Sequence, residues 1–181
     1  MGLPQPLVDP LREIEQAEIA RPVETLLEAT TASLKETVRA LSKATGDIEQ
    51  GAARVKGASR VVQEKAEEEI SAGNPSPDLD EHIESIFKME EDLRRDWLPH
   101  IELARKVKAG TFQLPRIGSA EKARLVNTLE RFIKATLSVL ETLRDLRWNL
   151  MTLRAEAEDP GEAPVFDNPQ DLLVYLKTPP K

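Results

Sequence analysis

The chain has 181 residues, 31% of them charged, and a formal net charge of −7, which suits one soluble domain or two small ones. It has no cysteine, which excludes disulfides, thiolate metal sites and thiol nucleophiles. Aromatic residues make up only 4%, which argues against an all-β sandwich or barrel. No apolar run approaches the ~20 residues that cross a bilayer, so we expect a cytoplasmic protein with no membrane contact.

The first half of the chain predicts one short and one long helix. Asp9-Pro10 is typical of a capped helix start and predicts a short helix over residues 10–20. A long helix over residues 22–72 follows, because core residues recur there every seven positions. One core position holds large residues: Leu27, Leu34, Leu41, Ile48, Val55 and Val62. The other core position, four residues later, holds mainly small residues: Thr31, Val38, Thr45, Ala52, Ser59 and Ala66. The small residues allow a neighbouring helix to approach closely.

Three glycines, Gly46, Gly51 and Gly57, lie in the middle of this long helix. Each weakens the helix by about 1 kcal/mol relative to alanine, which favours a bend there.

Two further long helices follow. Gly73 and the prolines after it end the first one, and the next helix is predicted over residues 79–109, with a kink at Pro99. The last long helix, over residues 119–158, carries an apolar stripe broad enough to face more than one neighbour. Asn168-Pro169 repeats the start signal seen at Asp9-Pro10 and predicts a short helix over residues 169–177.

These elements predict an all-α fold: an antiparallel bundle of three long helices with coiled-coil-like heptads, plus short terminal helices. Residues 1–158 form the elongated bundle domain, and residues 159–181 form a C-terminal extension with a short docking helix.

Charge is distributed unevenly along the chain. Residues 63–92 hold 11 acidic and 2 basic residues, a net of −9, whereas residues 93–154 hold 13 basic and 6 acidic residues, a net of +7. Neighbouring helices of a bundle attract one another across its surface with such a pattern. The alternative is a binding surface on residues 93–154 for an acidic protein or a nucleic acid, although the overall acidity and the few aromatic residues count against a nucleic acid.

Recognisable catalytic motifs are missing from the sequence. It contains no Walker, Gly-x-Gly-x-x-Gly, His-Glu-x-x-His or Gly-x-Ser-x-Gly pattern. Neither His82 nor His100 has a glutamate three residues before it, which argues against a di-metal bundle. We therefore expect no metal and no cofactor.

One short motif indicates an alternative. Arg95 and His100, separated by four residues, resemble the Arg-x4–6-His motif of the HEPN family of helical-bundle ribonucleases. The resemblance covers six residues and implies metal-independent RNA cleavage at a dimer interface. His100 would then move a proton from the 2′-hydroxyl group, and Arg95 would stabilise the pentavalent phosphate.

Two segments are candidates for partner binding. Trp148 is offset from the apolar stripe and flanked by Arg144 and Arg147, and tryptophan and arginine are enriched at interface hot spots. The C-terminal segment is too short to be a stable helix in isolation, so we expect it to dock, either on its own bundle or in the groove of a partner. Its candidate contacts are Leu172, Leu173, Tyr175 and Leu176. An edge strand over residues 172–176 is the remaining alternative.

The sequence thus favours a non-enzymatic helical interaction protein, such as a scaffold, adaptor or neutralising partner, that binds another protein or a second copy of itself as a homodimer. The alternatives are the ribonuclease with Arg95 and His100 and a nucleic-acid binder that uses residues 93–154.

Overall fold

The computed structural model describes residues 2–17, 19–73, 78–111 and 118–158. Within these ranges the chain is helical with no strand, which confirms the predicted all-α class. The helices are α1 (Gln5–Glu15), α2 (Ala20–Glu28), α3 (Thr31–Ser71), α4 (Leu79–Lys108) and α5 (Ser119–Glu158). None of these helices combines the length and the apolar character that crossing a membrane requires.

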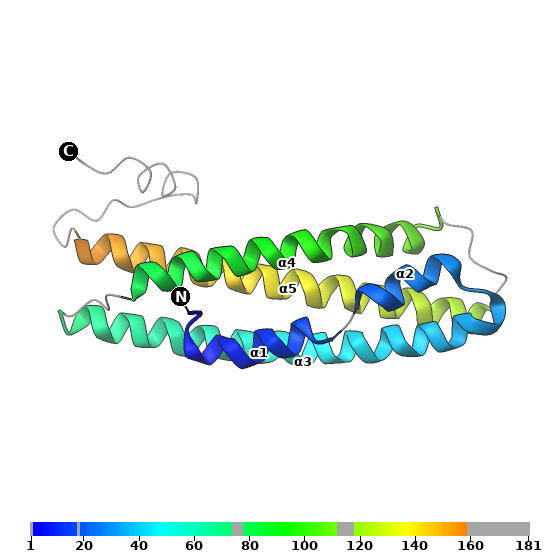
Figure 1. The fold of residues 1–181 in the computed structure, drawn as a ribbon, viewed down its shortest axis with the longest axis horizontal. Coiled ribbons are helices and arrows are strands. Elements are labelled where there is room, and N and C mark those ends of the chain that lie inside the picture. The colour runs from blue at the N-terminus through cyan, green and yellow to red at the C-terminus, as the bar shows by residue number, and fades with distance from the viewer. Residues whose placement is uncertain (1, 18, 74–77, 112–117, 159–181) are drawn as a thin grey trace.

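The three long helices lie side by side, and α5 packs against both α3 and α4 (Figure 1). The short helices α1 and α2 follow one another along the length of the bundle, where α1 packs on α3, and α2 contacts both α3 and α4. Together they occupy the place of a fourth, interrupted helix. Consecutive long helices run in opposite directions, as predicted.

The neighbours α3 and α5, however, run in the same direction. Two side-chain contacts between them show the register: Arg131 of α5 bonds Glu49 of α3, and Asn149 of α5 donates to Gln63 of α3 over 2.8 Å. Both members of the second contact lie further toward the C-terminus than those of the first. The parallel pair therefore aligns the first turns of α3 with the first turns of α5.

The core follows the predicted heptads. The large residues of α3 from residue 34 onward are all buried, namely Leu34, Leu41, Ile48, Val55 and Val62. The predicted apolar stripe of α5 is also buried over most of its length, with Phe132, Leu143 and Leu150 fully enclosed. One continuous hydrophobic core includes residues from all five helices.

The predicted helix boundaries in the N-terminal region were wrong. Instead of helices over 10–20 and 22–72, the structure has three helices, with a break at Ala29 and Thr30. Thr30 caps α3: its Oγ1 accepts a hydrogen bond from the Ser33 backbone N–H, and the Ser33 Oγ accepts one from the Thr30 backbone N–H over 2.9 Å. This reciprocal capping stabilises a new helix start inside the apolar heptad pattern.

The position of Pro10 was also misinterpreted: it lies inside α1, whose start is instead marked by Pro4 and Pro6. Pro99 lies inside α4, as predicted, and the helix continues on both sides of it. The expected helix over 169–177 lies outside the described residues.

Gly51 is the point of close approach between α1 and α3. A Cβ atom added to Gly51 would lie only 2.3 Å from Cγ1 of Ile14 in α1. Ile14 is itself buried, with 2% of its surface exposed. The glycine therefore removes the side chain that would prevent α1 from packing on α3.

Candidate functional site: a basic groove between α3 and α5

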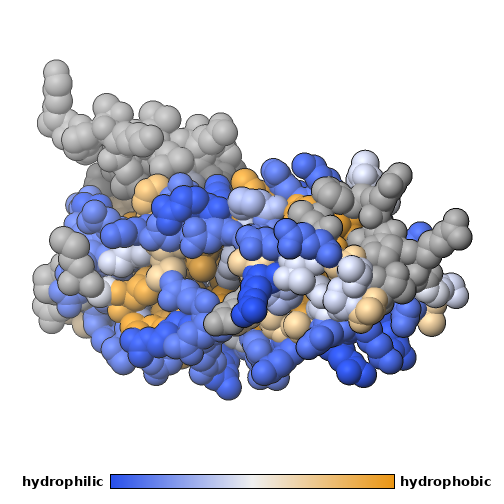
Figure 2. Space-filling view, turned by 45° about the vertical axis from the view of Figure 1, so that its right-hand side comes forward, coloured by the Kyte–Doolittle hydropathy of each residue, from blue (hydrophilic) through white to orange (hydrophobic). Residues whose placement is uncertain are grey.

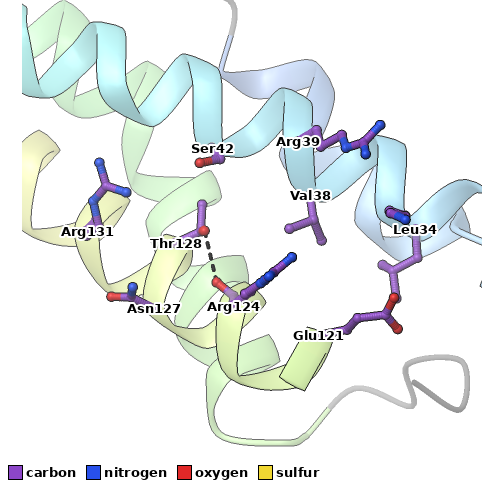
Figure 3. Close-up of a pocket in the computed structure, with 10 residues that line it drawn as sticks. Leu34, Val38, Arg39, Ser42, Glu121, Arg124, Asn127, Thr128 and Arg131 are labelled. Carbon is purple, nitrogen blue, oxygen red and sulfur yellow. Dashed lines mark hydrogen bonds between the residues drawn. The ribbon is translucent and has the colours of Figure 1, made fainter. Parts of the chain in front are cut away.

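The parallel packing of α3 and α5 forms a groove of about 340 Å³ between their first turns, here called the basic groove. Figure 3 shows Leu34 and Val38 directed from α3 toward α5, where Arg124 and Thr128 lie opposite them. Leu34, which is buried, and Val38, which is half-buried, form an apolar floor. The rest of the lining is polar or charged: Lys35, Arg39, Ser42, Glu121, Arg124, Asn127, Thr128 and Arg131.

Four cationic side chains line the groove, and only one of them is neutralised. Arg131 forms a two-pronged ion pair with Glu49, in which its Nε lies 2.9 Å from Oε1 of the carboxylate. This hydrogen bond holds the pKa of Glu49 below its ordinary value of 4.5, against a smaller opposing effect of burial. Lys35, Arg39 and Arg124 form no ion pair within the described part of the chain, so the groove attracts anions.

The polar groups of the groove differ in whether they already have a hydrogen-bond partner among the described residues. The Thr128 hydroxyl donates to the carbonyl oxygen of Arg124 over 2.9 Å and is almost fully buried, so it fixes the local geometry. Ser42 and Asn127 make no hydrogen bond to any described residue and can contact a ligand. No histidine lines the groove, and arginine does not exchange its proton near neutral pH. The lining therefore favours anion binding over acid–base catalysis.

The predicted interaction residues on α5, Arg144, Arg147 and Trp148, lie outside the basic groove, and Arg147 contacts α4. Arg147 is largely enclosed, with 13% of its side chain exposed, and its Nη2 lies 3.1 Å from Oε2 of Glu90. Its guanidinium also lies 5.0 Å from the ring centre of Phe87 and 5.7 Å from that of Trp148. Trp148 is half-buried. Arg147 is therefore part of the α4–α5 packing, whereas the exposed Arg144 pairs with its neighbour Asp145.

Glu90 is the residue that sequence reasoning missed. Only 1% of its surface is exposed, yet it carries two arginine partners, Arg94 at 2.8 Å and Arg147. A signal was available, because position 90 falls in the apolar stripe of α4 between Ile86 and Leu93. A carboxylate in such a stripe predicts a buried partner of opposite charge.

The acidic and basic blocks of the sequence do meet across the bundle surface. Arg147 with Glu90 is one pair between them, and Arg154 with Asp80, at 2.8 Å, is another. These pairs join α5 to α4. Part of the charge asymmetry therefore serves the packing of this helix pair.

Arg95 and His100, the two residues that resemble the ribonuclease motif, both lie on α4. Arg95 is exposed and pairs with Asp92 at 2.9 Å and Asp96 at 3.4 Å, while His100 is half-buried. Five positions on an α-helix advance by about 140°, so the two side chains leave α4 in different directions. A single chain does not bring them together.

Among the described residues, no group of three or more His, Asp or Glu side chains is placed to hold a metal ion. Leu172, Leu173, Tyr175 and Leu176 lie outside the described residues.

The chain matches no family model, no curated protein and no solved structure.

Proposed function

We propose that this chain is a non-enzymatic interaction protein that binds an acidic segment of another protein in the basic groove. The observation that carries the proposal is the set of three cations, Lys35, Arg39 and Arg124, which lack ion-pair partners in the described chain and surround an apolar floor. Carboxylates of the partner would pair with these cations, and an apolar side chain of the partner would cover Val38. Such complementary charge supplies specificity and speeds association.

A peptide fits this groove better than a nucleic acid does. Its lining holds no aromatic side chain on which a base could stack. The volume of about 340 Å³ accommodates a few side chains and lies near the lower end of the range for ligand sites.

Fluorescence anisotropy with two labelled probes tests the proposal. One probe is a short peptide of glutamate and leucine, and the other is a short single-stranded RNA of mixed sequence. We expect the peptide to bind and Arg39→Glu or Arg124→Glu to weaken it about tenfold or more. The matched control is Arg60→Glu, on the same helix but outside the groove, which should change affinity less than twofold.

Each contrary outcome has a distinct meaning. Tighter binding of the RNA than of the peptide would replace the proposal with a nucleic-acid function. Cleavage of the RNA that disappears in His100→Ala would support the ribonuclease alternative. Equal losses in Arg39→Glu and Arg60→Glu, or no binding of the peptide at all, would overturn the basic groove as a binding site.

A further inference from the structure

No described helix fills the fourth position of the bundle at the end where α3 finishes and α4 begins. α1 begins at Gln5, beside Val61 and Val62 of α3, so among the described helices only α4 and α5 lie next to the last turns of α3. The result is a hollow of about 450 Å³, here called the end furrow. Figure 2 shows hydrophobic residues gathered between hydrophilic ridges on this face of the molecule.

The end furrow has an apolar part and a polar part, and the polar part is formed by Gln5, Lys65, Glu69, Asp78 and His82. Val61, Val62 and Ala66 of α3 form one wall, Leu79 of α4 belongs to the other, and Leu150 of α5 lies in the floor. The start of α1, from Pro4 to Pro6, closes one end of the furrow.

Val61 is 52% exposed and is one of three large hydrophobic residues that the described chain leaves exposed. Val61 adjoins the other apolar residues that line the furrow, and a contiguous apolar surface marks an interaction site.

The chain supplies a segment of matching size at the same end. α5 ends at Glu158, eight residues beyond Leu150 of the floor. The nine residues 159–167 span up to about 30 Å when extended, which is enough to return to the furrow. A ten-residue helix is about 15 Å long, and the α3 wall from Val61 to Glu69 rises about 12 Å on the same basis.

We propose that residues 168–177 dock as a helix in the end furrow of their own chain and complete the four-helix cross-section. In a helix, Leu172, Leu173 and Leu176 fall at spacings of one and four residues and share one face. That face covers Val61 and Val62. Docking within one chain is favoured over docking on a second copy, because a short tether holds the segment at an effective concentration in the millimolar range.

The natural absence of cysteine allows a direct crosslinking test in the full-length chain. We expect the variant Val61→Cys with Leu173→Cys to form an intrachain disulfide in most molecules at low protein concentration. The control, Lys106→Cys with Leu173→Cys, places the first cysteine near the other end of α4 and should form none. Disulfides that are only intermolecular would assign the furrow to a second copy, and equal yields in both variants would overturn the proposal.

A double-mutant cycle provides a second, independent readout. In the full-length chain, Val61→Asp and Leu173→Asp should each lower the Tm by about 5 °C, because each places a charge in the apolar contact. The double variant should melt close to the single variants, because the contact is lost only once. Additive losses would place the two residues apart, and an unchanged Tm in Val61→Asp would show that nothing covers the furrow.

Discussion

The buried carboxylate of Glu90 provides the sharpest test of the packing between α4 and α5. Its side chain is 2% exposed and accepts hydrogen bonds from Arg94 at 2.8 Å and from Nε of Arg147 at 3.2 Å. Arg147 is held over the ring of Phe87 and cannot turn into water without leaving that contact. Replacing Glu90 with leucine would therefore leave a guanidinium without its counter-charge in a nearly dry site.

The size of the effect follows from the exposure of the two partners. Arg94 is 49% exposed, so it returns to water at little cost when the carboxylate is removed. Arg147, at 13%, stays enclosed, and breaking a buried pair costs about 3–5 kcal/mol. We therefore expect Glu90→Leu to lower the free energy of unfolding by about 3 kcal/mol, which for a chain of this size lowers the Tm by roughly 6–12 °C.

Thermal and urea unfolding of four proteins would test this reasoning: the natural chain, Glu90→Leu, Arg147→Met and the double variant. The double variant should regain most of the lost stability, because replacing both members of a buried pair with apolar residues is often neutral or stabilising. A Glu90→Leu protein as stable as the natural chain would refute the argument. A double variant whose loss equals the sum of the single losses would refute it as well.

Three further changes have expected outcomes that unfolding experiments can measure. Gly51→Ala should destabilise the fold by about 1–3 kcal/mol through the clash with Ile14. In the control Gly57→Ala the added Cβ would meet nothing within 4 Å, so this variant should be more stable by about 0.5–1 kcal/mol. Higher stability in both variants would contradict the close approach of α1. Thr45→Val should stabilise the fold by up to about 1 kcal/mol, because the buried Thr45 hydroxyl has no hydrogen-bond partner in the described chain; a clear loss would mean that it has one. The pKa of Glu49 is lowered by its Arg131 partner, so the pair stabilises the fold above pH 4.5 and loses this effect as the pH falls through the lowered value. Glu49→Gln should therefore reduce the loss of unfolding free energy on acidification by less than about 1 kcal/mol. An unchanged loss in this variant would contradict the pairing.

Periodicity along the chain was sufficient to predict the helical class and the buried faces. Leu41, Ile48 and Val55 recur every seven residues and are all fully buried, because this spacing keeps side chains on one face of a helix whatever its neighbour is. The same reasoning failed at Thr30, where a local capping interaction with Ser33 begins a new helix. The heptad continues through this break, so an apolar pattern alone does not detect it.

The basic groove and the Glu90 cluster depended on tertiary structure. Lys35 and Arg39 lie more than eighty residues from Arg124 in the sequence and line one groove only because α3 and α5 pack in parallel. Glu90 reaches Arg147 across 57 residues in the same way. Spacing determines which face of each helix is apolar, but the choice of neighbour depends on the summed burial of all five helices, which no single segment encodes. Side chains that meet only across helices, charged ones above all, therefore acquire their partners when the whole bundle assembles.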